Sequence, residues 1–423
     1  MTHLVVVGAS LAGLRAVEAV RRDGFDGDVT LVGAEEHLPY DRPPLSKEYL
    51  SADECPDPRY REEETFAGDL DVELVLGTPA SALDTTARTL TVGDRTLSYD
   101  GLVIATGAHA RVLPGTEHLE GVHTVRTLDD AIALRAALRA EHAKRLTVVG
   151  AGFIGSEVAA VGRKLGLEVT ILEALETPLA RAVGERMGRA LTHLHRRHGT
   201  EVRTGVAVEE VLSEDGRVTG VRLGDGTELA TDVLVVGIGA RPATDWLEGS
   251  GLTIDDGVVA DETLAAAPGV YVAGDVARWP NALFTDVADG TMRLEHWTSA
   301  ADQGGRAARH AVDPSAAKAY ETVPYFWSDW YDGRVQFVGI AAGEDIEVVA
   351  GDDTEGGPFT AIYRAGDRIV GALAVDMPAE VMKYRRLIGG RKSWDDALEL
   401  AEQRRRQRAE KARRAAEEQG AST

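Results

Sequence analysis

Two glycine-rich turns in this chain have the residue types and spacing needed to hold the phosphates of a dinucleotide. The first is VVVGASLAG, from Val5 to Gly13, and the second is VVGAGFIG, from Val148 to Gly155. Each lies between an apolar run typical of a strand and a run typical of a helix. The first N–H groups of a helix have no intrahelical partner and bind phosphate oxygens. The duplication therefore predicts two bound dinucleotides.

The second turn has the complete G-x-G-x-x-G pattern in Gly150, Gly152 and Gly155. These glycines allow a tight turn, a close approach of the backbone to a pyrophosphate, and close packing of the helix on the strand. The first turn keeps Gly8 and Gly13 but has a serine, Ser10, at the middle position. Its phosphate site must therefore accommodate a small side chain.

An acidic residue follows each turn at about the distance that ribose binding requires, roughly 20 residues. Glu173 ends the strand run EVTILEA, and no Lys or Arg follows before Arg181. A 2′-phosphate would meet a carboxylate there, so the second site is expected to prefer NADH over NADPH. After the first turn, the run DVTLVGAEE places the acid at Glu35 or Glu36.

The composition is that of a globular protein with two or three domains. The chain has 423 residues, of which 44% are hydrophobic, and a formal net charge of −23 that argues against nucleic-acid binding. Its first apolar strand begins almost at Met1, with no preceding leader, so a cytoplasmic protein is expected. The single cysteine, Cys55, excludes a two-cysteine redox centre, and the histidines show no metal-ligand spacing.

The order of strand and helix patterns indicates an α/β fold with two Rossmann-like dinucleotide-binding domains and a smaller α+β C-terminal domain. The first dinucleotide domain is expected to comprise residues 1–110 and 241–318, and the second residues 111–240. The C-terminal domain, with an antiparallel sheet, is expected at 319–395. Residues 396–423 contain the Arg-rich run EQRRRQRAEKARRAAEE and are interpreted as a helical, partly disordered tail with a solvated surface.

Further motifs in this order resemble the FAD-dependent, NADH-linked ferredoxin reductases that serve Rieske oxygenases and cytochromes P450. They are YDRPPLSK from Tyr40 to Lys47, LVIATGA, VVGAGFIGSEVAA, VVGIGARP, YVAGDVARW, EHW and FWSD. The resemblance covers nearly the whole chain and implies a glutathione-reductase-like arrangement, with FAD in the first domain and NADH in the second. The sequence departs from the family pattern at two positions. Ser10 replaces the usual middle glycine, and Ala34 stands where several relatives carry the ribose acid, so Glu35 is expected to take that role.

The resemblance and the glycine turns together give a set of candidate residues. Those expected to contact FAD are Gly8, Ser10, Ala12, Gly13, Glu35, Arg42, Lys47, Ala80, Thr106, Arg126, Gly274, Asp275 and Trp297. Those expected to contact NADH are Gly150, Gly152, Phe153, Ile154, Gly155, Glu173, Arg181, Gly237 and Gly239. Lys47 and Glu157 are the candidate catalytic residues. Trp297 also fits an ordinary core position, and Glu157 also fits a glutamate that complements a helix dipole.

The resemblance implies that hydride passes from NADH to FAD and that single electrons then pass to a [2Fe-2S] ferredoxin. Trp327 and Trp330 are placed near the electron exit or in the core of the third domain, and Arg306 and Arg309 are candidate docking residues. The protein is expected to be a monomer or a weak homodimer without a metal site. The alternatives are an NADH oxidase, a nitrite-reductase-type subunit, and an NADH sensor resembling apoptosis-inducing factor.

Overall fold

The computed structural model describes residues 1–288, 290–343 and 345–420. The contacts divide the chain into two compact units, which are described separately. The first unit comprises Met1–Glu176 and His198–Thr322, and the second comprises Thr177–Arg197 and Val323–Thr423.

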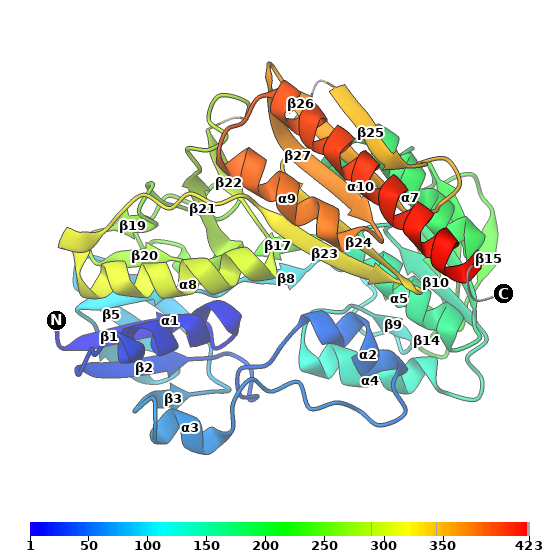
Figure 1. The fold of residues 1–423 in the computed structure, drawn as a ribbon. Helices are drawn as coiled ribbons and strands as arrows, with labels where there is room; N and C mark the ends of the chain where they lie inside the picture. Colours follow the sequence, from blue (N-terminus) through cyan, green and yellow to red (C-terminus); the bar gives the residue numbers. More distant parts are fainter. Residues whose placement is uncertain (289, 344, 421–423) are drawn as a thin grey trace. The chain divides into compact units, whose positions relative to one another are not determined.

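The first sheet of the first unit carries the first glycine-rich turn (Figure 1). In sheet order its strands are β19 (Ala265–Ala267), β20 (Val270–Val272), β7 (Gly101–Ile104), β1 (His3–Val7), β2 (Asp28–Val32) and β3 (Glu73–Val75). All neighbours are parallel except β19 and β20. β1 is rich in valine and buried, as expected for a parallel strand covered on both faces. Because β20 pairs with β7, the chain returns to this sheet after residue 241.

The second sheet carries the second glycine-rich turn and repeats the same order. Its strands are β12 (Glu201–Thr204), β11 (Glu168–Glu173), β10 (Arg145–Val149), β16 (Val233–Val236) and β9 (Val122–His123), all parallel. In both sheets the strand before the turn lies between the strand that leads to the acid and a later closing strand. The two Rossmann-like halves that the sequence predicts are therefore confirmed.

Two helices of the first unit begin at these turns, α1 (Leu11–Arg22) after the first and α5 (Phe153–Lys164) after the second. Its other helices are α2 (Glu48–Ser51), α3 (Glu63–Ala67), α4 (Leu128–Leu138) and α8 (Trp297–Val312). α8 lies beside α1 (Figure 1). A Cβ at Gly304 would lie 2.1 Å from the carbonyl oxygen of Ala12, so glycine at this position permits the close approach.

The first unit also contains small sheets and short 3-10 turns. The sheets are β4 (Ala80–Asp84), β5 (Thr89–Val92) and β6 (Arg95–Ser98); β13 (Val208–Glu214), β14 (Arg217–Leu223) and β15 (Glu228–Ala230); β8 (Ala108–Ala110) and β17 (Ala240–Pro242); and β18 (Val258–Val259), β21 (Ala277–Pro280) and β22 (Thr291–Arg293). The turns are η1 (Pro43–Ser46), η2 (Asp245–Leu247), η3 (Gly274–Val276) and η4 (Pro314–Ala316).

The second unit has an antiparallel five-stranded sheet, as the sequence predicts for the C-terminal region. In order, its strands are β23 (Tyr325–Trp330), β24 (Gly333–Gly339), β27 (Arg368–Val375), β26 (Phe359–Ala365) and β25 (Asp345–Gly351). Its helices are α6 (Ala180–Val183), α7 (Glu185–Arg197), α9 (Pro378–Gly389) and α10 (Trp394–Gly420).

The segment 177–197 packs on the C-terminal sheet, although the sequence pattern includes it in the stretch 111–240. The hydroxyl group of Tyr363 donates to the carbonyl oxygen of Val183 at 2.7 Å. Arg186 pairs with Asp353 at 2.9 Å. Nothing in the local sequence distinguishes this helix from one that covers its own parallel sheet, because the contacts join residues far apart in the chain.

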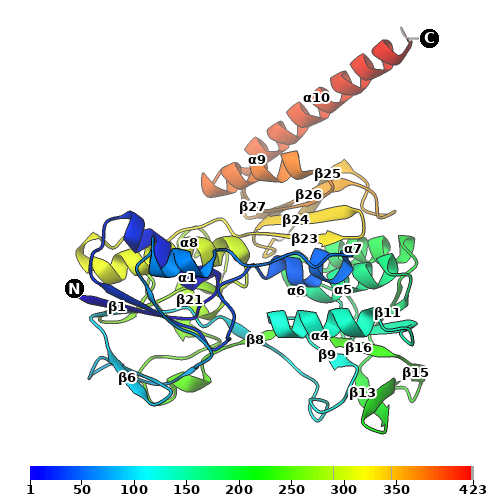
Figure 2. The same cartoon turned by 90° about the horizontal axis from the view of Figure 1, so that it is seen from below.

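The C-terminal helix α10 is tied to α9 by one buried carboxylate. Glu380 is 5% exposed and pairs with Arg404 at 2.9 Å and with Arg408 at 3.0 Å. Beyond these pairs α10 extends well past α9 (Figure 2). Residues 421–423, part of the tail expected to be partly disordered, lie outside the described residues. Of the helices described, none has the length and apolar character of a membrane span.

Candidate functional site

Two glycines of the second glycine-rich turn are required by the fold, and the third is not. Gly150 has a φ of +99°, and a Cβ on Gly155 would lie 2.2 Å from the carbonyl oxygen of Gly150. Both positions therefore need glycine for the fold itself. Gly152 differs, because it has a φ of −76° and its Cβ would lie 3.7 Å from the nearest protein atom, the carbonyl oxygen of Gly237. The protein leaves room for a methyl group there, which fits a glycine kept for a ligand.

The first turn shows why a serine is tolerated at its middle position. Gly8 has a φ of +116°, and its Cβ would lie 2.1 Å from the carbonyl oxygen of Ala105. A Cβ on Gly13 would lie 2.0 Å from the carbonyl oxygen of Gly8. Ser10, at the N-cap of α1, has extended backbone geometry, and its hydroxyl oxygen accepts from Arg42 Nε at 3.3 Å. The outer glycines are thus required by packing, while the middle position accepts a small side chain.

The N-termini of α1 and α5 have the features of anion-binding sites. In these two helices, which lie wholly within the described residues, the first turn holds no acidic side chain, and the N-cap side chain accepts no hydrogen bond from the backbone N–H groups of its own helix. In contrast, α4 begins with a complete capping box formed by Thr127 and Asp130. A helix start without a cap or an acid fits the diphosphate of a dinucleotide.

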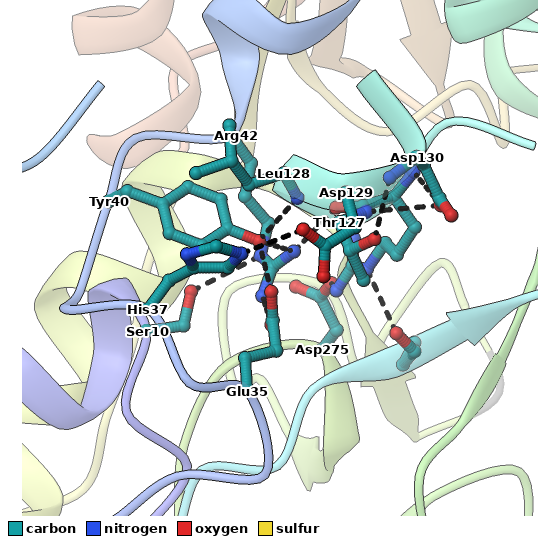
Figure 3. Close-up of polar contacts among 12 residues, drawn as sticks. Ser10, Glu35, His37, Tyr40, Arg42, Thr127, Leu128, Asp129, Asp130 and Asp275 are labelled. Carbon is teal, nitrogen blue, oxygen red and sulfur yellow. Dashed lines mark hydrogen bonds and ion pairs between the residues drawn. The ribbon is translucent and has the colours of Figure 1, made fainter. Parts of the chain in front are cut away.

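The loop from Tyr40 to Lys47 carries a cationic side chain to the first turn (Figure 3). Arg42 pairs with Glu35 at 2.6 Å and donates to the backbone oxygen of Arg126 at 2.5 Å. It also donates to the hydroxyl oxygen of Tyr40 at 2.9 Å. Glu35, rather than Glu36, therefore lies in this cluster, which supports its choice as the ribose acid.

A second arginine joins the same cluster from another part of the chain. Arg126 pairs with Asp275 at 2.8 Å and donates to the backbone oxygen of Ala108 at 2.9 Å. Asp275 lies in η3, next to Gly274, whose N–H donates to the buried side chain of Gln303 at 2.8 Å. The fold thus brings two arginines and two carboxylates to the first turn. Arginine suits diphosphate because its planar fork donates two hydrogen bonds at once.

A buried ion pair joins the loop to the helix of the second turn. Lys47 Nζ lies 2.8 Å from Glu157 Oε2, and the two side chains are 15% and 2% exposed. Lys47 also donates to the carbonyl oxygen of Pro43 at 2.9 Å. The hydroxyl group of Ser46 donates to the same oxygen of Glu157. Ser46 and Tyr40 were not among the residues expected at the site, although both belong to the YDRPPLSK motif.

Glu173 is held beside the second turn by two backbone donors. Its Oε2 accepts from the N–H of Ala151 at 2.9 Å, and its Oε1 accepts from the N–H of Leu175 at 2.8 Å. Each carboxylate oxygen keeps a second lone pair for a ligand hydroxyl group. The geometry is that expected of a ribose acid.

Comparisons with known proteins agree with this geometry. Residues 2–304 match the model of the pyridine nucleotide-disulphide oxidoreductases, and residues 325–408 match that of the reductase C-terminal domain. The chain belongs to the pyridine nucleotide-disulphide oxidoreductase family. It is therefore an oxidoreductase, and proteins of this family use FAD and NAD(P)H.

Named relatives of this oxidoreductase are similar over almost their whole length. Rhodocoxin reductase of Rhodococcus erythropolis is 36% identical, over 91% of this chain and 89% of the relative. Putidaredoxin reductase of Pseudomonas putida is 33% identical, over 92% of each. The solved structure of the covalent putidaredoxin reductase–putidaredoxin complex matches with a TM-score of 0.86 and 32% identity, covering 92% of this chain and 93% of that chain.

The other candidate FAD residues of this family member lie in the first unit. The indole N–H of Trp297, the first residue of α8, donates to Asp41 Oδ1 at 2.8 Å and lies 3.2 Å from the hydroxyl oxygen of Tyr60. Thr106 donates to the backbone oxygen of Ala243 at 3.0 Å. Ala12 is buried in α1, and Ala80 begins β4 and packs on the core.

The other candidate nicotinamide residues belong to both units. Phe153 and Ile154 are the first residues of α5, with Ile154 43% exposed. Gly237 and Gly239 lie in the turn after β16. Arg181 belongs to α6 of the second unit, where its side chain is exposed.

The candidate exit and docking residues have partners within their own units. Trp330 is 2% exposed and stacks on His195 with ring centroids 4.8 Å apart, so it is a core residue of the second unit. Trp327 stacks on Tyr325 at 5.9 Å. In the first unit, Arg309 pairs with Asp23 at 2.5 Å, and Arg306 lies over the ring of Tyr320 at 5.5 Å.

Cys55 is an exposed free thiol. Within the three described ranges, no group of three or more His, Cys, Asp or Glu side chains has a metal-binding arrangement.

His296, the N-cap of α8, makes the stability of this oxidoreductase depend on pH. Burial lowers the pKa of His296 to about 4, opposed by the charge of Asp275. The unfolded chain, with a histidine pKa of about 6.5, binds a proton that the folded chain does not. Stability from this group is therefore present above pH 6.5 and lost as pH falls toward 4, by up to about 1.4 kcal/mol per pH unit.

Urea unfolding between pH 7.5 and 4.5, followed by tryptophan fluorescence, checks this dependence. His296→Gln should flatten it, whereas His118→Gln, at an exposed histidine, should leave it unchanged. Equal slopes in the wild-type protein and in His296→Gln would contradict the assignment.

Proposed function

We propose that this protein passes the reducing equivalents of NADH through FAD, one electron at a time, to a [2Fe-2S] ferredoxin that serves a cytochrome P450 or a Rieske oxygenase. The pair of Lys47 and Glu157 carries the proposal. Lys47 comes from the loop of the first turn and Glu157 from the helix of the second, and their atoms lie 2.8 Å apart. The reactive ends of two dinucleotides held at these turns would therefore meet beside this pair.

The side chains of this protein would bind and orient the two dinucleotides and neutralise part of their charge. Arg42 and Arg126 would compensate the charge of the diphosphate bound at the first turn, and Glu35 would accept hydrogen bonds from the ribose hydroxyl groups. Lys47 and Glu157 would orient the nicotinamide and place a compensated charge beside it. Bound FAD supplies the exchange between two-electron and one-electron chemistry.

The acceptor is inferred from the cysteine count and from the relatives. Reduction of a disulphide by the protein's own thiols needs two cysteines, and this chain has only Cys55. The electrons must therefore leave by another route. Relatives named as ferredoxin reductases, and the complex of putidaredoxin reductase with putidaredoxin, favour an iron–sulfur protein. We also propose, from the sequence, a cytoplasmic location and a monomer or weak homodimer.

Anaerobic titration of the FAD-containing protein with NADH tests the first step, and reduction of putidaredoxin or another [2Fe-2S] ferredoxin tests the second. The expected results are bleaching of the flavin absorption by one equivalent of NADH and catalytic reduction of the ferredoxin. Rapid consumption of oxygen without ferredoxin reduction would reject the proposal and favour an oxidase. Slow turnover that gains nothing from the ferredoxin would favour a sensor.

Replacing Glu173 tests the preference for NADH. Glu173→Gln removes the charge that opposes a 2′-phosphate and weakens the bonds to the ribose, so the ratio of kcat/KM for NADH to that for NADPH should fall about tenfold. Glu168→Gln, an exposed glutamate on the same strand, is the matched control. An unchanged ratio in Glu173→Gln would show that another residue selects the nucleotide.

A further inference from the structure

We propose that Tyr40 is a positioning residue that holds Glu35 for the adenosine ribose of FAD, and that its hydroxyl group thereby favours FAD over FMN. The inference rests on the proposed function, in which FAD occupies the first glycine-rich turn. FMN has no adenosine and cannot use Glu35 in this way.

The hydroxyl group of Tyr40 uses its full hydrogen-bonding capacity in three directions (Figure 3). It donates to Glu35 Oε2 at 2.5 Å and accepts from Arg42 Nη1 at 2.9 Å. It also accepts from the backbone N–H of Leu128 at 2.9 Å. A phenol has one donor and two acceptor positions, so each is occupied. One oxygen thus joins the acid, the cation and a helix.

The N–H group of Leu128 is a rigid partner for the Tyr40 hydroxyl group because it belongs to the backbone of a helix. Leu128 is the first residue of α4, whose capping box is formed by Thr127 and Asp130. The box satisfies other N–H groups and leaves that of Leu128 to Tyr40. A hydroxyl group held by a helix start fixes Glu35 more precisely than a mobile side chain could.

Glu35 keeps capacity for a ligand after these contacts. Its Oε1 accepts from Arg42 and its Oε2 from Tyr40, which leaves one lone pair on each oxygen. The side chain is 30% exposed. Two neighbouring ribose hydroxyl groups match two such acceptors. Without the Tyr40 hydroxyl, Glu35 would be held by Arg42 alone and would have to be ordered when the ligand binds.

The ring of Tyr40 is placed independently of its hydroxyl group. The residue is 3% exposed, and its backbone bridges to Arg59. The Arg42 guanidinium carbon lies 4.9 Å from the centroid of the Tyr40 ring. The His37 ring packs edge-to-face on it, with ring centroids 6.2 Å apart. Burial raises the pKa of Tyr40, although Arg42 opposes this, so the hydroxyl group keeps its proton. Phenylalanine at this position keeps the ring contacts and removes only the hydrogen bonds.

The experiment compares the affinity for FAD with that for FMN in the full-length protein. Dilution of the FAD-containing protein, followed by flavin fluorescence, gives the Kd of FAD, and displacement by FMN gives the ratio of the two affinities. The proteins are wild type, Tyr40→Phe, Glu35→Gln and the double variant. Tyr99→Phe is the control, since Tyr99 is buried and its hydroxyl group has no hydrogen-bond partner among the described residues.

Tyr40→Phe should raise the Kd of FAD about tenfold and leave that of FMN unchanged, as expected for one hydrogen bond to a charged group. In the Glu35→Gln background the same change should have less than about a twofold effect, because Tyr40 acts through Glu35. Tyr99→Phe should match the wild-type protein.

Equal weakening of FAD and FMN, or an undiminished effect of Tyr40→Phe in the Glu35→Gln background, would overturn the inference. So would a large fall in Tm with an unchanged affinity ratio, since that marks a purely structural role. A wild-type protein that binds no flavin would instead reject the proposed function itself.

Discussion

Replacing Gly152 with alanine is expected to raise the KM for NADH at least about tenfold while the protein stays folded. The methyl group would lie 3.7 Å from the nearest protein atom, and the φ of −76° suits alanine. The cost to the fold should therefore be only about 1 kcal/mol, the difference between glycine and alanine at an N-cap. The loss of affinity would come from contact between the methyl group and the pyrophosphate.

Gly155→Ala is the matched comparison, since its methyl group would lie 2.2 Å from the backbone oxygen of Gly150. Neither atom can move without shifting the turn, so this variant should lose about 3 kcal/mol of stability or more. Steady-state kinetics with NADH and urea unfolding of both variants check the pair. If Gly152→Ala unfolds as readily as Gly155→Ala, or keeps the wild-type KM, the separation of ligand and packing roles is wrong.

Lys47→Met is expected to slow flavin reduction by NADH about a hundredfold and to destabilise the fold by about 3–5 kcal/mol. The cause is the buried carboxylate that remains, because Glu157 is 2% exposed and would lose the cation that balances its charge. Glu157→Gln should destabilise less, since Lys47 is 15% exposed and keeps its bond to Pro43. It should nevertheless slow flavin reduction.

Stopped-flow reduction by NADH and urea unfolding measure the two effects. Lys164→Met replaces an exposed lysine at the end of the same helix α5 and serves as the control. Equal destabilisation by Lys47→Met and Glu157→Gln would contradict the asymmetry in burial. Unchanged flavin reduction in both variants would remove the pair from the proposed mechanism.

At the first glycine-rich turn, the sequence limits the ribose acid to two neighbouring residues but does not distinguish between them. Spacing along the strand left Glu35 and Glu36 both open as the ribose acid. The fold places Glu35 against Arg42 and Tyr40, while a Cβ on Gly77 would lie 3.1 Å from Glu36 Cγ. Two adjacent residues differ here only by the direction in which the turn points them, and that direction depends on packing.

The aromatic residues of the third domain give a second example. Their motif allows Trp327 and Trp330 to lie near the electron exit, but it favours core packing in the third domain for at least one of them. Trp330 is buried against His195, which comes from α7, more than a hundred residues earlier in the chain. A pattern with a period of two shows which residues share one face of a strand, but not which face a distant helix covers.

Local sequence patterns were sufficient to predict the two Rossmann-like halves and the antiparallel C-terminal sheet, because glycine spacing and strand period are local properties. The choice of Glu173 as a ribose acid stays a prediction. The tertiary structure was needed to show that Ser46 contacts Glu157, that Tyr40 joins Glu35 to α4, and that α6 and α7 pack on the C-terminal sheet. Such contacts join residues brought together by the burial of two sheets and their helices. No short stretch of sequence contains that information.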